Sequence, residues 1–313
     1  MLPLRAATAR EQTALDRTYL GEILSTLTAV VWALAVVLFR RAGDFMPPLT
    51  LNLFKGWIGL SLAVATHLMT GGSWLPGSHP GEVRDALVLF VSGVIGIGMA
   101  DTLFFVALNR LGASRLAIVD CSYSPFVMIF SFLMLGEPVT MWLPVAAVLM
   151  GLAIVAGTWE PRAFDPEAWK REKGGIAIAT VAVALMAFAI VLVKPILDRS
   201  PIWWALSIRL GGGVSFLLAL GILPRHRRNV LAALRPGRAW IPALFPAVLG
   251  TYLAIYLWTR GIQLTYVNIA SVLNQLSNVF ILPLAALILK ERMQARHWLA
   301  VLLGFGAGAM VFL

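Results

Sequence analysis

The stretch Met46–His67, MPPLTLNLFKGWIGLSLAVATH, is long and apolar enough to cross a bilayer, yet it carries Lys55 near its middle. A membrane-spanning helix needs about 20 mostly apolar residues. An ionisable side chain at bilayer depth costs about 3 kcal/mol on insertion scales, so such residues face a protein interior or a water-filled cavity. Lys55 is therefore interpreted in two ways, as half of an ion pair between helices or as a charge that lines a path for substrate or ions.

The composition of the whole chain agrees with a membrane protein. Of its 313 residues, 59% are hydrophobic and 13% are charged, whereas soluble domains carry about 25% charged residues. The net charge of +10 comes from basic residues in short loops, which is typical of loops that hold helices in a membrane and not of nucleic-acid binding. The sequence predicts an all-α polytopic protein of the cell membrane, either a plasma membrane or a bacterial inner membrane.

The hydrophobic runs predict ten membrane-spanning helices. They cover residues 19–39, 46–68, 86–108, 114–135, 139–158, 174–194, 202–223, 240–262, 267–289 and 295–313. A polar, charged segment at 159–173 divides the chain into halves at 19–158 and 174–313, and residues 1–18 are predicted to be an N-terminal tail. The single cysteine, Cys121, excludes an internal disulfide. The four histidines are scattered without metal-ligand spacing, so the sequence predicts neither a metal nor another cofactor.

The two halves are copies of one another. When the chain is shifted by 154 residues, glycines, alanines, prolines and a glutamate coincide without a gap. The matched pairs include Gly21 with Gly175, Ala35 with Ala189, Pro47 with Pro201, Gly59 with Gly213, Gly96 with Gly250, Glu137 with Glu291, and Lys55 with Arg209. Five spans per copy is an odd number, so the second copy enters the membrane from the other side. The sequence thus predicts an inverted repeat, with a substrate site near the midplane between the halves.

The order of these features resembles the EamA-type members of the drug/metabolite transporter superfamily. The resemblance covers about residues 20–313. It is carried by Trp32 and Arg40 in the first helix, Lys55 in the second, the ALNRLGAS turn at 107–114, Pro125, the LGEP turn at 135–138, and their counterparts Lys194, Arg209 and Lys290-Glu291-Arg292. The resemblance implies a ten-helix secondary transporter, often an exporter of small metabolites, amino acids or drugs. Ala33, which stands where glycine is common, and Val279, which stands where Pro125 has its counterpart, depart from the pattern.

Several side chains within the predicted spans are candidates for substrate binding or ion coupling. Asp101 and Asp120 are interpreted either as ion-pair partners of Lys55 or Arg209 or as proton or cation carriers. Asn274 and Asn278, four residues apart on one predicted helical face, either bind substrate or join helices. Tyr123 belongs to the matching region of the fourth span. Trp32 is interpreted as a core residue or a pocket wall. Glu137 and Glu291, at helix ends, are interpreted as caps or as partners of loop residues.

The predicted function is secondary transport of a small metabolite, amino acid or drug by alternating access. Two cations and two acids balance in charge, and an excess of cation at one stage of transport would favour substrates that bear a carboxylate or phosphate. A channel or uniporter is the alternative, and an enzyme is not predicted because no nucleophile–base set, P-loop or GxSxG motif occurs. Lys and Arg are more numerous in the loops on the side opposite the N-terminus, which places both termini outside the cell. The resemblance implies cytoplasmic termini, so the orientation stays open. The oligomeric state also stays open.

Overall fold

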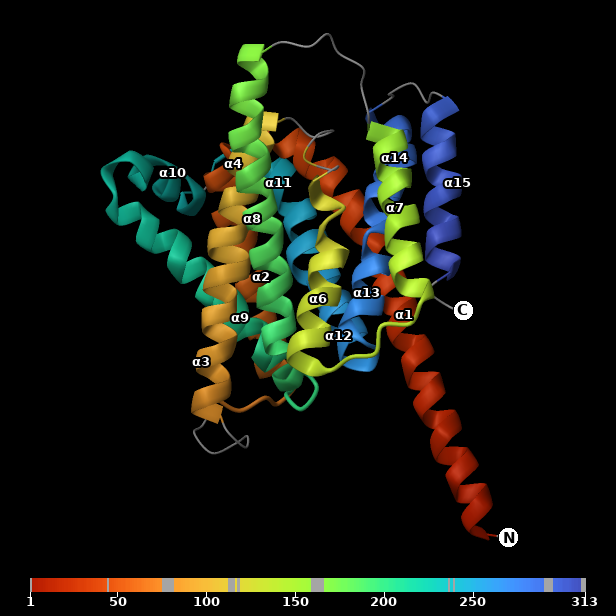
Figure 1. Cartoon of the computed structure of the whole chain (residues 1–313). Helices are drawn as coiled ribbons and strands as arrows, with labels where there is room; N and C mark the ends of the chain where they lie inside the picture. The colour runs from red at the N-terminus through yellow and green to blue at the C-terminus, as the bar shows by residue number, and fades with distance from the viewer. Residues whose placement is uncertain are drawn as a thin grey trace.

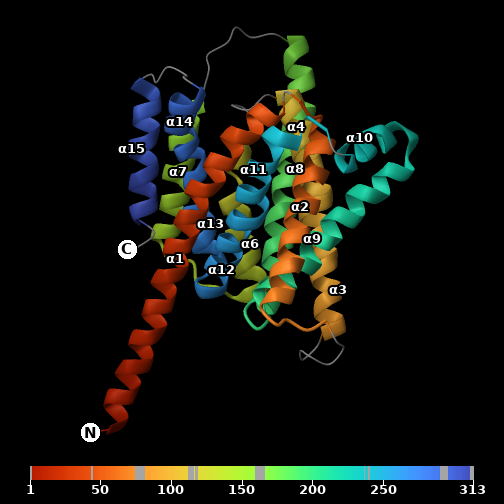
Figure 2. The ribbon, with the colours of Figure 1, turned by 180° about the vertical axis from the view of Figure 1, so that it is seen from behind.

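The computed structural model describes residues 2–43, 45–74, 82–111, 116, 119–158, 166–235, 237–238, 240–289 and 295–310. All regular elements within these residues are helical (Figures 1 and 2). The first half contains α1 (Leu2–Ala42), α2 (Pro48–Met69), α3 (Glu82–Gly93), the π-helix η1 (Val94–Ala100), α4 (Asp101–Leu111), α6 (Tyr123–Leu135) and α7 (Trp142–Thr158). The second contains α8 (Pro166–Leu197), α9 (Ile202–Ala219), the short 3₁₀ turn η2 (Leu220–Ile222), α10 (Pro224–Leu234), α11 (Trp240–Ala247), the π-helix η3 (Val248–Ala254), α12 (Ile255–Leu264), α13 (Val267–Asn274), α14 (Leu276–Leu289) and α15 (Ala295–Met310).

Two of the predicted segment boundaries fall inside long helices. Residues 2–18 continue directly into the first span as one helix, α1, which projects from the bundle at its N-terminal end (Figure 1). Residues 166–173 likewise form the start of α8. The amphipathic helix α10 also projects from the bundle (Figure 1), with Arg227 and Arg228 exposed beside Leu231 and Leu234.

Within the described residues, six helical segments are long and apolar enough to cross a membrane. They are Arg17–Phe39, Pro48–Met69, Val83–Phe104, Lys173–Leu197, Ile202–Ile222 and Trp240–Leu264. Shorter apolar helices cover Tyr123–Leu135, Trp142–Ala156 and Val267–Ile281. Turns occur at Cys121–Ser122 in the predicted fourth span and at Gln275 in the predicted ninth span. The figure of ten spans stays a prediction.

The helices follow the register of the sequence repeat. Helices α2 and α9 begin 154 residues apart, each directly after a proline, Pro47 or Pro201. The π-helices η1 and η3 begin and end 154 residues apart, and the interruptions at Cys121 and Gln275 also correspond. Proline before the first turn suits a helix start because it lacks the N–H that a first turn cannot pair. The duplicated sequence has therefore produced duplicated local structure, including its irregular parts.

The principal helix contacts join one half to the other. Helix α2 packs on α9, α1 on α12 and on α13–α14, α4 and α6 on α8, and α7 on α15. Each of these contacts has an equivalent in the other half. Helix α1 corresponds to α8 and α4 to α12, so the contact of α1 with α12 is equivalent to the contact of α8 with α4. In Figure 1 the chain rises along α1 from the N-terminus, whereas it descends along α8.

Glycines allow the closest of these approaches. A Cβ atom on Gly59 would lie 2.6 Å from Cγ2 of Thr251, and one on Gly213 would lie 2.6 Å from Cγ2 of Ile97. Gly59 and Gly213 are repeat counterparts, as are Ile97 and Thr251, which lie in the two π-helices. The absence of a side chain at these glycines lets α2 and α9 pack directly against η3 and η1.

Candidate functional site

Lys55 forms an ion pair inside the bundle. Its Nζ donates a hydrogen bond of 3.2 Å to Oδ2 of Asp101, the first residue after η1. The Lys55 side chain is 10% exposed and that of Asp101 22%. The Nζ atom also lies 6.0 Å from the ring centroid of Trp32, the outer limit of a cation–π contact. The π-helix positions this carboxylate, as such irregular turns often do at functional sites.

Arg209, the repeat counterpart of Lys55, lies in the same region of the bundle and is buried. Its guanidinium passes over Gly96, where an added Cβ would lie 3.6 Å from Nη2, and it lies within electrostatic range of Asp101 and Tyr123. Among the described residues, its Nε has no hydrogen-bond partner. A buried, unpaired donor on a charged group is costly, so this guanidinium is suited to receive an anionic group.

Asp120 belongs to a second polar cluster, at the interruptions of the fourth and ninth spans. Asn278 Nδ2 donates to Asp120 Oδ2 at 3.3 Å and to Gln275 Oε1 at 2.8 Å. Gln275 Nε2 donates to the backbone carbonyl of Asp120 at 2.8 Å. The described hydrogen bond to this carboxylate therefore comes from an amide, whereas an ion pair with Lys55 or Arg209 was one of the two interpretations of Asp120. Tyr123 lies within electrostatic range of both Arg209 and Asp120.

Asn274 stands apart from these contacts. Its Oδ1 is buried without a hydrogen-bond partner among the described residues. Asn274 is the last residue of α13 and Asn278 lies in α14, which begins at Leu276. That the two side chains share one helical face stays a prediction. The N–H of Gln275 is shared between the carbonyls of Ser271 and Val272, at 3.3 and 3.2 Å, so the turn tightens here.

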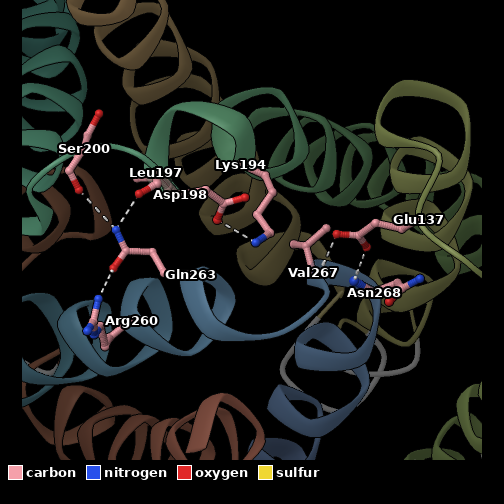
Figure 3. A network of polar contacts seen from close by, with 9 residues as sticks. All are labelled: Glu137, Lys194, Leu197, Asp198, Ser200, Arg260, Gln263, Val267 and Asn268. Atoms are coloured by element: carbon pink, nitrogen blue, oxygen red, sulfur yellow. Dashed lines mark hydrogen bonds and ion pairs between the residues drawn. The ribbon is translucent and has the colours of Figure 1, made fainter. Parts of the chain in front are cut away.

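Glu137 links the two halves at one end of the bundle (Figure 3). Its Oε1 accepts a 3.0 Å hydrogen bond from the backbone N–H of Val267, and Oε2 accepts one of 3.2 Å from Asn268. These N–H groups belong to the first turn of α13 and have no partner within the helix. Burial raises the pKa of Glu137, and the two N–H groups oppose this shift. Its predicted role as a cap is confirmed, although the helix that it caps belongs to the other half; Glu291 lies outside the described residues.

Other polar contacts at this end were not predicted from the sequence. Gln263 Nε2 donates to the carbonyls of Leu197 and Ser200, at 2.5 and 3.3 Å, and Arg260 Nη1 donates to Gln263 Oε1 at 2.9 Å (Figure 3). Lys194 pairs with Asp198 at 2.6 Å. The contacts of Gln263 with Leu197 and Ser200 join residues 66 and 63 positions apart, so no sequence pattern could have singled them out. The Lys194–Asp198 pair has the i, i+4 spacing of an ion pair on one helix.

The sequence also matches known proteins. The model of the EamA-like transporter family matches twice, at residues 19–158 and 173–313. Protein PecM of Dickeya dadantii is 29% identical over 70% of this chain and 71% of its own length. An uncharacterized transporter of Archaeoglobus fulgidus is 27% identical over 88% and 92%. A protein of known crystal structure shares the fold, with a TM-score of 0.74, 19% identity and coverage of 94% of this chain and 98% of its own.

These matches span both halves of a chain whose described residues are helical, with several apolar helices long enough to cross a bilayer. The chain is a multi-pass membrane protein, and it belongs to the EamA-like transporter family.

Proposed function

We propose that this protein is a secondary transporter that moves a small organic molecule by alternating access around the cluster formed by Lys55, Asp101, Arg209 and Tyr123. The observation that carries the proposal is the placement of this cluster. Lys55 and Arg209 come from α2 and α9, counterpart helices of the two halves that pack against each other. Charges buried between repeats are typical of substrate sites in transporters.

An inverted repeat supplies the conformational change. The opposite directions of α1 and α8 (Figure 1) and the contacts that survive exchange of the halves support a pseudo-two-fold axis in the membrane plane. With such an axis, each half can adopt the conformation of the other, which opens the site to the opposite side. Glu137 on Val267 and Asn268 would then hold one end closed. Its counterpart Glu291 would make the equivalent contact when the other end closes.

The two halves differ in a way that favours an anionic substrate. In the first half Lys55 has Asp101 as its partner, but the residue that corresponds to Asp101 in the second half is Ile255. Arg209 therefore lacks the acid that its repeat position would provide. A substrate carboxylate or phosphate would supply it, and guanidinium is the side chain best suited to bind either group in a bidentate manner.

Asp120 is the proposed site of proton coupling. It is a carboxyl group within a predicted span, its described hydrogen bond comes from an amide, Asn278, and no ion pair to it is seen among the residues that the structure describes. Tyr123 connects it electrostatically to Arg209, which provides a physical route by which an anion at Arg209 would alter proton binding at Asp120. The direction of net movement is proposed to be export, as the family resemblance implies.

The test is flux in proteoliposomes for amino acids, organic acids, organic phosphates and cationic drugs, with and without a proton gradient. The parent protein is compared with Arg209→Gln and with Arg228→Gln, which removes the same charge from exposed α10. Gradient-driven, saturable flux of anionic compounds that is reduced at least tenfold in Arg209→Gln alone is the expected result. Flux that does not saturate and ignores the gradient would instead indicate a channel or uniporter, and accumulation of cations alone would contradict the anionic substrate.

A further inference from the structure

A groove of about 600 Å³ lies at the end of the bundle that Glu137 closes, outside the charge cluster. Three segments form it: α1, the turn between α8 and α9, and the C-terminal end of α12. The lining residues are Arg17, Leu20, Asp198, Arg199, Ser200, Pro201, Arg260, Gln263 and Leu264. Three guanidinium groups thus face a groove that has one carboxylate, Asp198, and that carboxylate is already held by Lys194 at 2.6 Å.

Two of the three arginines of this groove are held in place by contacts that leave part of each guanidinium unused. Arg199 donates twice from Nη2 and once from Nε to the buried carboxylate of Asp85, at 2.7 to 3.2 Å. Arg260 donates from Nη1 to Gln263, which is itself anchored to the α8–α9 turn. Among the described residues, no hydrogen bond uses Nη1 of Arg199 or Nη2 of Arg260. Prepositioned donors of this kind bind an anion with little loss of side-chain entropy.

The backbone adds to the attraction for anions. Helix α9 is 18 residues long and begins at Ile202, directly after Ser200 and Pro201 of the groove, and no side chain caps it. The first N–H groups of a helix are unpaired, and its N-terminus carries partial positive charge. The groove therefore combines guanidinium groups with a helix N-terminus, the combination that favours phosphate.

An apolar strip leads away from the groove along α1. Tyr19, Leu20, Ile23, Leu27 and Val30 are each between 38% and 59% exposed, and their spacing places them along one side of the helix. Leu20 belongs to both the strip and the groove. A ligand with a phosphate group at one end and hydrocarbon at the other would match both features. Basic pockets between membrane helices bind lipid headgroups for this reason.

We propose that the groove formed by Arg17, Arg199 and Arg260 binds the phosphate of an anionic membrane phospholipid, whose acyl chain lies along the exposed strip of α1. The proposal concerns a site separate from the charge cluster and does not depend on the transported substrate. It assigns a role to Arg17, Arg199 and Arg260, which the transport proposal does not use.

Native mass spectrometry of the full-length, delipidated protein titrated with phosphatidylglycerol tests the proposal. Arg17→Gln and Arg260→Gln are each expected to weaken binding of the tightest lipid about fivefold, the value expected for one arginine near a lipid phosphate. The matched control is Arg84→Gln, since Arg84 is exposed at the start of α3 and does not line the groove. Phosphatidylcholine, which has no net charge, is expected to bind much more weakly to the parent.

Three results would overturn the proposal. Binding that is unchanged in both groove variants would show that the arginines do not hold the lipid. An equal loss in Arg84→Gln would show attraction to net charge alone. Displacement of phosphatidylglycerol by millimolar inorganic phosphate would show that the groove binds free anions and that the apolar strip contributes nothing.

Discussion

The carboxylate of Glu137 accepts a 3.0 Å hydrogen bond from the backbone N–H of Val267, a residue 130 positions further along the chain and in the other repeat. The contact is buried and joins the end of one fourth-position helix to the start of its counterpart. Under the proposed alternating-access mechanism, this contact would break and re-form in each transport cycle.

Removal of the Glu137 carboxylate should therefore loosen this end of the bundle. Glu137→Ala leaves two first-turn N–H groups of α13 unpaired, a loss of about 0.5–2 kcal/mol by comparison with other helix caps. In a Cys121→Ser background, a cysteine in place of buried Ser271 is expected to react faster with a maleimide when Glu137 is alanine. Glu137→Gln, which keeps one acceptor, should give an intermediate rate. Exposed Tyr266→Cys is the control, and an equal acceleration there would point to general unfolding.

The ion pair between Lys55 and Asp101 should respond differently to loss of its two members. Asp101→Asn leaves Lys55 and Arg209 near each other without that carboxylate, whereas Lys55→Met leaves Asp101 within range of Arg209. Breaking a fully buried pair costs about 3–5 kcal/mol, and partial exposure of Asp101 reduces this. We expect about 2 kcal/mol for Asp101→Asn and about 1 kcal/mol for Lys55→Met in denaturant unfolding. A double variant as unstable as the sum of the two would show that the pair contributes no coupling.

Glycine packing between counterpart helices gives a prediction with an internal control. Gly213→Ala places a Cβ 2.6 Å from Cγ2 of Ile97, whereas a Cβ on Gly211, two residues earlier in α9, meets nothing within 4 Å. Gly213→Ala should lower stability by about 1–3 kcal/mol through overpacking. Gly211→Ala should be neutral or stabilising by up to about 1 kcal/mol through helix propensity. Melting temperatures in detergent would compare them, and equal values would argue against direct packing at Gly213.

Ile255→Asp tests the asymmetry between the two halves. This substitution gives Arg209 the acid that Asp101 provides for Lys55. If a substrate anion normally binds Arg209, the new carboxylate should compete with it and raise the KM for anionic substrates about tenfold or more. Ile255→Asn, which is polar but uncharged, is the control and should retain most of the affinity. Similar KM values for the two variants would separate substrate binding from the charge at Arg209.

Asp120→Asn addresses coupling separately from binding. The asparagine keeps the shape of the side chain and removes its titratable group. Proton-driven accumulation should disappear, whereas exchange of labelled for unlabelled substrate at equal concentrations should continue. Asp120→Glu, which remains titratable, should keep part of the accumulation. Loss of exchange in Asp120→Asn would mean that Asp120 is needed for binding or folding and not for coupling alone.

Much of the architecture could be predicted because it is encoded in local composition and in self-similarity. Hydropathy identified the helices, and the 154-residue register anticipated that α2 and α9 begin at matching positions. The same register paired Lys55 with Arg209 before any contact was known. The interruptions near Cys121 and Gln275 were not predicted, because the polar residues beside them, among them Asp120 and Asn274, were interpreted as candidates for binding or coupling and not as helix breaks.

The sequence by itself determined that the chain is a duplicated, membrane-embedded member of its family, because the length of apolar segments and internal repetition can be read directly from the order of residues. It also showed that a few charged residues lie within the apolar segments. Only the tertiary structure decided which partners those charges have. Asp101 pairs with Lys55, Asp120 with the amide of Asn278, and Glu137 with the first turn of α13. These partners lie 46 to 158 residues apart, and a hydrogen bond forms only where packing of whole helices brings two atoms within about 3 Å.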